Sequence, residues 1–227
     1  MPTVVFANPK GGSSKSTSCL VLATMLAKAG RTVAILDTDR NQPIADWRTG
    51  KSQSPVRVIS NKDVDEDRIV RVIEAERKKH EYVFVDTEGS SSLLVSRAIL
   101  RADFVLVPLQ ASAVDARQAS RAVALVRREE EVISRTIPFQ VLLTRTSPLI
   151  QTSLEKEIAS VMAKAKLPTF KIHLHERQAF KLMFARRLAL DELDVGKVSG
   201  LDKAIANAEA LAEEFTQVVN TKEPAHV

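Results

Sequence analysis

Residues 4–17, VVFANPKGGSSKST, place a glycine-rich loop between an apolar run and a helix-forming segment. Gly11 and Gly12 allow the backbone to turn its N–H groups inward, and the N-terminus of the following helix adds a positive dipole end. Between a strand and a helix, this is the pattern of a phosphate-binding loop. The alternative, a Gly-Gly turn with incidental lysines, is disfavoured by that context.

The loop suggests roles for its polar side chains and also departs from the usual pattern. Lys15 can reach the β and γ phosphates of a nucleotide, and Ser16 can offer its hydroxyl to Mg²⁺. The pattern G-x-x-x-x-G-K-[ST] has glycine where this chain has Pro9 and Ser14. If position 14 needs a positive φ, the serine adds a strain of about 1 kcal/mol or more. In that case we expect a weaker nucleotide site, whereas with an ordinary backbone the hydroxyl merely adds a donor near phosphate.

Two acidic motifs follow apolar runs further along the chain. TVAIL (32–36) leads into Asp37 and Asp39, and YVFVD (82–86) ends on Asp86. Carboxylates at the carboxyl ends of parallel strands lie at the ligand-binding edge of a sheet. An aspartate at a strand end suits an indirect or water-mediated contact with Mg²⁺. Singly, each could be a turn residue or a helix cap; in this order behind the loop they favour a nucleotide site.

The wider pattern predicts an α/β fold, a doubly wound and mostly parallel sheet with helices on both faces. Near-continuous apolar runs are typical of strands covered on both faces, and helical patterns alternate with them. The expected strands lie near residue 5 and at 32–36, 82–86, 104–108, 139–143 and, more weakly, 170–174. The expected helices lie at 18–30, 64–80, 91–102, 116–133, 154–165 and after residue 200. We expect one domain over 1–220, a frayed tail over 221–227 and a surface loop at 52–55.

Composition narrows the class of protein. The chain has 227 residues, 44% hydrophobic content and a net charge of +5, which suits a globular domain rather than a disordered chain. The single cysteine, Cys19, excludes an intrachain disulfide framework and a cysteine-clustered metal site. No apolar stretch approaches the roughly 20 residues of a membrane span, and the start lacks a signal-peptide layout. We expect a cytoplasmic location.

The loop motif resembles a known family. KGGxxK[ST], with an extra lysine at its start, is similar to the deviant Walker A motif of the ParA/MinD superfamily of ATPases, and the chain resembles its smaller ParF-like and VirC-like members. The resemblance runs from residue 3 to about 185. The stretches that carry it are NPKGGSSKST, VAILDTDRNQPIADW, YVFVDTEGSSS, RADFVLVPLQASAVD, LLTR and HERQAF. It implies a P-loop NTPase that uses ATP and Mg²⁺.

The resemblance also implies roles by position. Lys10 resembles the signature lysine that crosses an ATP-sandwich dimer to the partner's phosphates, where it would act with Lys15 and Asp39 in catalysis. Asp39 resembles the carboxylate that positions the attacking water. The implied ATP-binding residues are Lys10, Gly11, Gly12, Ser13, Ser14, Lys15, Ser16 and Thr17, and the implied metal site is Ser16, Asp37 and Asp86. Asp37 would support the metal or the loop. Arg40 stands where many relatives have proline, and its charge near the nucleotide edge is either functional or simply solvated; the base rate for surface charges favours the solvated interpretation.

A basic window lies in the last third of the chain. Between residues 164 and 187, seven Lys or Arg residues and one acid, Glu176, give a net charge of +6. Flexible cations of this kind suit contacts with a phosphate backbone that do not read the bases. For any single residue, a solvated surface charge is an equally good interpretation. The candidate DNA-binding residues are Lys171, Arg177, Lys181, Arg186 and Arg187.

Together these features predict an ATPase of the ParA type that partitions plasmids or other DNA. ATP would drive a homodimer that binds non-specific DNA and associates with the nucleoid. A ParB-like or other adaptor protein would stimulate a hydrolysis that is otherwise slow. Alternatives in the same superfamily are a VirC-like or chemoreceptor-cluster positioning ATPase, a MinD-like membrane-cycling ATPase and a small-molecule ligase. The acidic last helix disfavours membrane binding.

Overall fold

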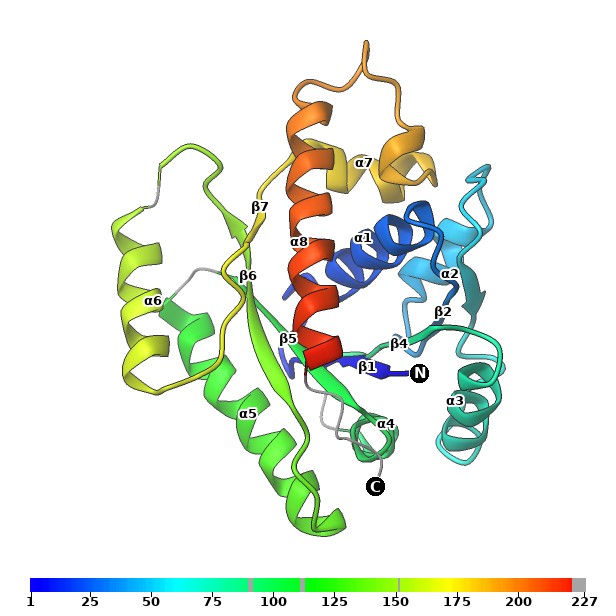
Figure 1. Ribbon diagram of the computed structural model, residues 1–227, viewed down its shortest axis with the longest axis vertical. Coiled ribbons are helices and arrows are strands. Elements are labelled where there is room, and N and C mark those ends of the chain that lie inside the picture. Colours follow the sequence, from blue (N-terminus) through cyan, green and yellow to red (C-terminus); the bar gives the residue numbers. More distant parts are fainter. Residues whose placement is uncertain (90–91, 111–112, 151, 222–227) are drawn as a thin grey trace.

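The computed structural model describes residues 1–89, 92–110, 113–150 and 152–221, with the backbone alone over 113–119. Its described strands form one seven-stranded sheet in the order β3-β2-β4-β1-β5-β6-β7, and every neighbouring pair is parallel (Figure 1). The strands are β1 Thr3–Phe6, β2 Val33–Asp37, β3 Arg57–Ile59, β4 Tyr82–Asp86, β5 Phe104–Gln110, β6 Phe139–Thr146 and β7 Leu174–His175. The predicted doubly wound parallel sheet is confirmed.

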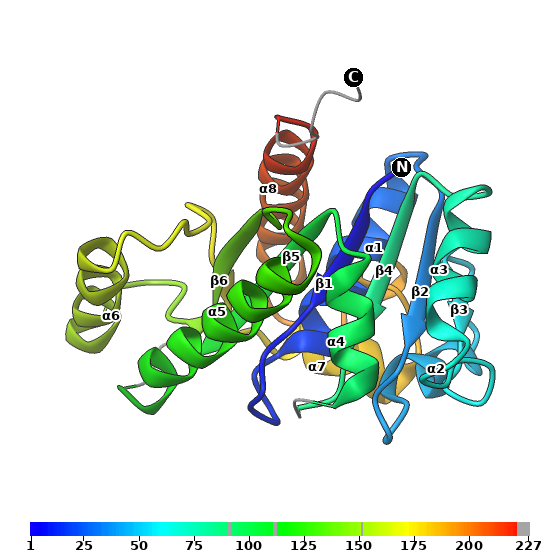
Figure 2. The same ribbon diagram turned by 90° about the horizontal axis from the view of Figure 1, so that it is seen from below.

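Helices cover both faces of the sheet, as Figure 2 shows from below. One face carries α1 (Lys15–Lys28), α2 (Pro43–Arg48), α7 (Gln178–Arg186) and α8 (Leu201–Thr221). The other carries α3 (Ile69–Arg77), α4 (Leu93–Leu100), α5 (Ala113–Ile133) and α6 (Ser153–Lys164). A short 3₁₀ helix, η1 (Leu190–Glu192), precedes α8. Along the described residues, no helix combines the length and apolarity needed to cross a membrane.

Burial on both faces explains the continuous apolar runs of the sequence. In β1, Val4 and Phe6 point into the core beneath α1 and α8, whereas Val5 and the following Ala7 point into the core beneath α3, α4 and α5. All four are at most 1% exposed. Side chains alternate between the faces of a strand, so only a sheet with two covered faces requires apolar residues at every position.

The first helix begins earlier than its apolar pattern indicates. α1 starts at Lys15 rather than residue 18, so the lysine and the hydroxyls of the motif lie in its first turn. At the other end, Gly30 has φ +82° and donates to the Ala27 carbonyl, while Arg31 donates to the Leu26 carbonyl. These two bonds form a Schellman motif, which confirms the expected glycine cap.

The expected strand at 170–174 is wrong over most of its length. The N–H groups of Lys171 and Ile172 donate to the Glu214 carboxylate of α8 (2.8 and 2.7 Å) instead of a neighbouring strand. Thr169 bridges to Val141 of β6, the Phe170 N–H donates to the Val141 carbonyl (2.9 Å), and regular pairing with β6 is confined to Leu174 and His175. Two short helices, α2 and α7, and the edge strand β3 were not expected, because elements of three to nine residues show little periodicity.

Several boundaries also differ from expectation. The helix predicted at 64–80 begins at residue 69, after a turn in which Arg68 donates to the Asp65 carboxylate. The 52–55 segment is not simply a surface loop, because Ser52 and Ser54 are buried. Residue 91 of the predicted helix 91–102 lies outside the described residues, as does 222–227 of the predicted tail; α8 reaches Thr221.

Candidate nucleotide-binding site

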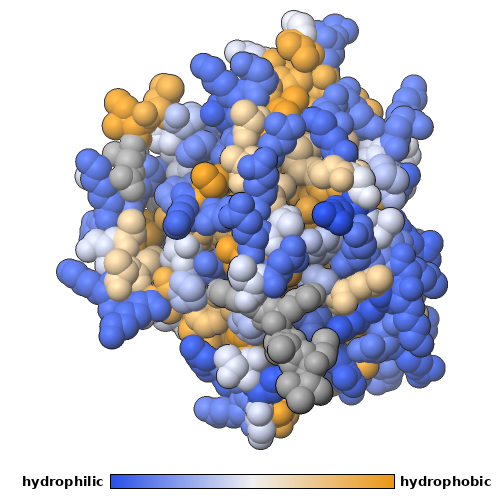
Figure 3. Space-filling view, in the orientation of Figure 1, coloured by the Kyte–Doolittle hydropathy of each residue, from blue (hydrophilic) through white to orange (hydrophobic). Residues whose placement is uncertain are grey.

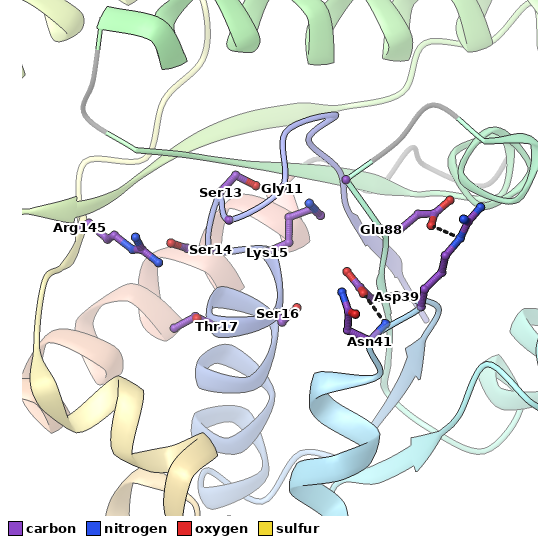
Figure 4. Close-up of a pocket in the computed structure, with 13 residues that line it drawn as sticks. Gly11, Ser13, Ser14, Lys15, Ser16, Thr17, Asp39, Asn41, Glu88 and Arg145 are labelled. Atoms are coloured by element: carbon purple, nitrogen blue, oxygen red, sulfur yellow. Dashed lines mark hydrogen bonds and ion pairs between the residues drawn. The ribbon is translucent and has the colours of Figure 1, made fainter.

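A cavity of about 380 Å³ opens at the carboxyl edge of the central strands (Figure 4). It lies where β1, β2 and β4 lead into their loops, so it brings together the glycine-rich loop and the residues that follow the acidic strand ends. The lining residues are Gly11, Gly12, Ser13, Ser14, Lys15, Ser16, Thr17, Asp39, Arg40, Asn41, Glu88, Gly89 and Arg145. Seven of the eight predicted ATP-binding residues are among them.

The glycine-rich loop contains two left-handed residues. Gly12 has φ +74°, and Ser14 has φ 71° and ψ 24° immediately before α1. Position 14 is therefore one that favours glycine, and the serine is strained there. Gln110, at the end of β5, donates through its side-chain amide to the Gly12 carbonyl. This contact fixes the tip of the loop to the sheet.

Asn8 anchors the start of the same loop. Its side-chain amide donates to the Pro108 carbonyl (2.7 Å), and its Oδ1 accepts from the N–H of Lys10 (2.9 Å). Asn8 is 2% exposed. Because a buried amide with both ends engaged cannot rotate freely, Asn8 sets the direction in which the chain leaves β1.

The Lys15 ammonium lies inside the loop. Lys15 is buried, and its Nζ donates to the carbonyls of Asn8 (3.1 Å) and Lys10 (3.2 Å). Burial lowers its pKa, and the carboxylates of Asp86, Asp39 and Glu88 oppose that shift. These carboxylates favour the protonated, positively charged form of Lys15 beneath the loop, where an anionic phosphate chain would lie.

Asp86 is the most desolvated carboxylate of the site. It is fully buried at the end of β4, and burial raises its pKa to about 8. The Ser16 hydroxyl opposes this shift, but it reaches neither oxygen with hydrogen-bonding geometry, and both oxygens lack a partner among the described residues. A buried carboxylate without donors is costly unless something else neutralises it. A divalent cation and its water would do so.

Asp37 has a different environment at the end of β2. Its Oδ2 accepts from the N–H groups of Ile44 and Ala45 (both 2.8 Å), and its Oδ1 accepts from the Asp39 N–H (3.3 Å). Burial raises the pKa of Asp37 to about 6, while these three donors oppose the shift. Asp37 thus holds the first turn of α2, a geometry that favours its loop-supporting role over a direct metal contact.

Asp39 lies in the cavity wall and is held from its own loop. Its Oδ1 accepts from the N–H of Asn41 (2.8 Å), and its carbonyl accepts from the side chain of Asn61 (3.2 Å). Figure 4 shows Asp39 and Ser16 bordering the same space beside Lys15. The carboxylate is therefore positioned to accept a further hydrogen bond from a group in the cavity.

Gly89 brings the loop after β4 against the phosphate loop. A Cβ added to Gly89 would lie 2.6 Å from the Gly11 nitrogen, 2.9 Å from its Cα and 3.0 Å from the Lys10 carbonyl carbon. No other residue type fits this approach without a shift of the backbone. The two loops thus lie in close backbone contact, which the glycine alone does not reveal in the sequence.

Sequence reasoning missed the lining residues Asn41 and Arg145, and it gave Glu88 no role of its own in the site. Arg145 closes the wall of the cavity near Ser14 and has φ +53°. Its position at the end of an apolar strand, like that of the aspartates, was the available signal. Arg40, expected to be solvated, is 86% exposed, yet its Nε lies 2.9 Å from the Glu88 carboxylate.

A second cavity of about 170 Å³ adjoins the first and shares Ser14, Thr17 and Arg145 with it. Leu174, Phe180 and Phe184 contribute apolar walls. The Thr144 hydroxyl and the Arg177 Nε, also on residues of this cavity, are buried and have no hydrogen-bond partner among the described residues. A largely apolar pocket with a few polar groups suits a flat ring carrying hydrogen-bonding atoms.

The candidate DNA-binding residues lie on α7 and on the segments beside it. Arg177 lines the second cavity, and Lys181 lies 2.5 Å from the Glu176 carboxylate. Arg187 donates to both oxygens of Asp46 on α2 (2.8 and 3.2 Å). Lys171 and Arg186 are exposed. Two of the five charges are thus neutralised by surface carboxylates, and Lys171 lies beside Glu214 of α8 rather than on α7.

The donor set around Asp86 fits Mg²⁺. Among the described residues, no group of three or more His, Cys, Asp or Glu is arranged to hold a metal ion by itself. Mg²⁺ commonly takes one or two protein oxygens and completes its shell with water and substrate phosphates. The Ser16 hydroxyl and Asp86, with its partnerless oxygens, match that mode.

Comparison with known proteins covers nearly the whole chain. The family model described as VirC1 protein matches residues 1–223. The protein ParA of Rhizobium radiobacter is 36% identical over 212 residues, 93% of this chain and 95% of its own length. An ATP complex of McdA from Cyanothece has a TM-score of 0.73 at 18% identity, covering 95% of this chain and 96% of that one.

A putative plasmid partition protein from Borrelia burgdorferi B31, solved with AMPPNP, has a TM-score of 0.71 at 19% identity, covering 95% of this chain and 98% of that one. At these identities the solved structures establish the fold, which is that of the ParA/MinD type of P-loop ATPase. The predicted resemblance is confirmed: the chain belongs to the VirC1 protein family, among the ParA-like proteins.

Proposed function

We propose that this chain is a DNA-partitioning ATPase that binds ATP with Mg²⁺ in the cavity beneath residues 10–17. The observation that carries the proposal is the convergence of Lys15, Asp39 and the partnerless Asp86 on one glycine-rich loop. The loop N–H groups and the α1 terminus would bind the phosphates. The base would enter the second cavity, which adjoins the loop beside Thr17.

The residues of the site divide the chemistry of hydrolysis between them. Lys15 neutralises charge on the β and γ phosphates, and Asp39 orients the attacking water. Ser16 and Asp86 would hold Mg²⁺, which would neutralise charge on the phosphate oxygens, and Asp37 keeps the β2–α2 loop in place. Hydrolysis to ADP and phosphate is slow without a partner. Ser14 is strained, and the site of a single subunit lacks the second lysine that would stabilise charge on the phosphates.

Lys10 would complete the site from a second subunit. It lies at the mouth of the loop, half-exposed, outside the set of residues that line the cavity of its own chain. A lysine so placed can reach phosphates bound to a facing copy, where it would stabilise transition-state charge as an arginine finger does. The ATP-bound form is therefore a homodimer.

The dimer would then bind DNA through the basic residues beside α7. Dimerisation doubles the number of cations presented to one duplex, and the ion pairs of Lys181 and Arg187 are exposed enough to exchange for phosphate contacts. An adaptor protein that stimulates hydrolysis would reverse the binding and release the DNA. The chain would in this way cycle on and off the nucleoid in the cytoplasm.

Fluorescence anisotropy with a random-sequence DNA duplex tests the proposal. We expect binding with ATP and Mg²⁺, little binding with ADP, and a steep loss of affinity with salt. Exchanging Lys171 and Arg186 for glutamate should weaken binding by at least tenfold and flatten the salt dependence. The matched control is Lys78→Glu, an exposed lysine that follows α3 on the opposite face. Equal wild-type binding with ATP and with ADP would exclude ATP-dependent DNA binding. A loss of DNA affinity in Lys78→Glu equal to that caused by the changes at Lys171 and Arg186 would exclude binding through these basic residues.

A further inference from the structure

An ion pair with an exposed arginine crosses the rim of the nucleotide cavity. Arg40 follows Asp39 in the β2–α2 loop, and its Nε lies 2.9 Å from Oε2 of Glu88 in the loop after β4. The Arg40 side chain is 86% exposed, whereas that of Glu88 is 15% exposed. Both residues line the cavity, and a dashed line in Figure 4 marks their contact at Glu88. The pair thus joins two loops at the mouth of the site.

The position of Arg40 along the cavity is informative. Arg145 lies on the wall shared with the second cavity, where the base would bind, and Asp39 and Glu88 lie on the opposite side (Figure 4). Arg40 belongs to that opposite side, because it follows Asp39 and pairs with Glu88. Lys15 lies between these two walls. A nucleotide with its base near Arg145 and its phosphates along the loop would therefore direct its last phosphate toward Arg40.

An anion that carries more charge than a carboxylate can displace Glu88 from this ion pair. The arginine end of this pair is exposed, so water screens its charge and the long side chain loses freedom in the contact, which leaves little net stabilisation. A contact through Nε leaves further donors on the planar guanidinium, which matches a phosphate with two parallel hydrogen bonds. A doubly charged terminal phosphate would therefore compete successfully with Glu88 for Arg40.

Glu88 is also linked mechanically to the phosphate loop. The next residue, Gly89, approaches the backbone of Lys10 and Gly11 closely. Release of Glu88 from Arg40 would therefore change a loop that touches the phosphate-binding backbone. The ion pair is placed to report to that loop whether a terminal phosphate is present.

We propose that Arg40 binds the terminal phosphate of a nucleoside triphosphate, and that Glu88 holds Arg40 when that phosphate is absent. This inference rests on the proposed function, since it requires ATP in the cavity. It makes Arg40 a residue that distinguishes ATP from ADP, because ADP has no phosphate at the Arg40 end of the site. Glu88 opposes ATP binding only through Arg40.

Calorimetric titration with Mg²⁺ and either AMPPNP or ADP tests the inference without hydrolysis. Arg40→Ala should weaken AMPPNP binding about tenfold and change ADP binding less than about twofold, as expected for loss of one charge-assisted contact. Arg40→Lys should restore part of the AMPPNP affinity. Glu88→Gln should strengthen AMPPNP binding, and this gain should vanish when Arg40→Ala is also present. Arg31→Ala, an exposed arginine paired with Glu81 away from the cavity, is the matched control.

The outcomes separate this inference from the function beneath it. A wild-type chain that binds neither nucleotide would overturn both. If the wild type binds AMPPNP and Arg40→Ala weakens AMPPNP and ADP equally, or neither, Arg40 does not read the terminal phosphate and the ATPase proposal stands. A gain from Glu88→Gln that is the same with and without Arg40 would show that Glu88 repels the nucleotide directly, which also contradicts the inference.

Discussion

Ser14 is the residue at which this loop differs most from the ordinary phosphate loop, and its conformation gives the difference a physical meaning. With φ 71° it occupies the left-handed region that glycine enters at no steric cost. The Ser14 side chain accepts no hydrogen bond from the first turn of α1, so no capping bond offsets the strain. The loop keeps its shape because Asn8 and Gln110 hold it from the sheet.

Replacing Ser14 by glycine should stabilise the fold. Ser14→Gly removes the left-handed strain, which outweighs the greater freedom that glycine has in the unfolded chain, and should raise the free energy of unfolding by about 0.5–1 kcal/mol. Ser13→Gly is the control, because Ser13 has no positive φ and should lose about that amount instead. Urea denaturation measures both. A loss of stability in Ser14→Gly would mean that the serine conformation is not strained.

Asp86 predicts a pH dependence of stability in the chain without nucleotide or Mg²⁺. Its pKa is about 8 in the folded state because of burial, against an ordinary value of about 3.9 in the unfolded state. Between these values the folded chain retains a proton that the unfolded chain has lost, so the free energy of unfolding from this group falls as pH rises. The contribution of Asp86 to the free energy of unfolding is therefore fully present below about pH 4 and is lost by about pH 8.

Asp86→Asn removes the titration and isolates its effect. The free energy of unfolding of Asp86→Asn minus that of the wild type should be larger at pH 8.5 than at pH 5. This difference should change by on the order of a few kcal/mol between the two pH values. Thermal unfolding in EDTA at both pH values measures this. A variant whose difference from the wild type is the same at both would show that Asp86 is ionised throughout, against the burial argument.

At the scale of elements, the loops after β2 and β4 and the loop after β1 form one unit. Asp37 holds α2 to β2, Asn61 holds the Asp39 carbonyl, and Gly89 presses the third loop onto Gly11. None of these contacts follows from periodicity, because each joins residues that are far apart in sequence or depends on one backbone approach. The acidic strand ends could be predicted from the sequence, but their separate roles could not.

Gly89→Ala should weaken nucleotide binding while leaving the fold intact. A Cβ at 2.6 Å from the Gly11 nitrogen forces the phosphate loop to shift, and a shift of this size misplaces the N–H groups that would bind phosphate. We expect at least a tenfold loss of AMPPNP affinity by calorimetry, with a circular dichroism spectrum like that of the wild type.

The control for that loop change is Gly196→Ala. The nearest atom to an added Cβ there is an Asp194 carboxylate oxygen at 3.3 Å, in a surface segment before α8 that lines neither cavity. The Gly196→Ala variant should bind AMPPNP with the affinity of the wild type. Wild-type affinity in Gly89→Ala as well would show that the two loops are not coupled.

At the scale of the whole molecule, the sequence predicts the sheet well and its margins poorly. Strands buried on both faces are visible as apolar runs, so the five central strands β1, β2, β4, β5 and β6 were expected near their observed positions. The edge strands β3 and β7 have three and two residues and bury one face at most, which leaves little pattern. Residues 170–173 looked like a strand, but Glu214 binds the N–H groups of Lys171 and Ile172 and interrupts the pairing with β6.

The same contrast holds for the function. The loop motif identified the family and the cavity, because its residues act within one short segment. The basic residues beside α7 form no such segment in space: Arg177 faces a cavity and Arg187 binds Asp46. Net charge along the sequence could therefore indicate an anionic partner without indicating which side chains touch it.

The central claim is that a second subunit completes the ATP site through Lys10, and one comparison tests it most directly. ATP hydrolysis, AMPPNP affinity and ATP-dependent DNA binding should be measured for the wild type, Lys10→Ala and Lys15→Ala. Lys15→Ala should weaken AMPPNP binding at least tenfold, because it removes the buried cation of the loop. Lys10→Ala should retain most AMPPNP affinity yet lose DNA binding and hydrolysis. A Lys10→Ala chain that hydrolyses ATP and binds DNA like the wild type would contradict the account.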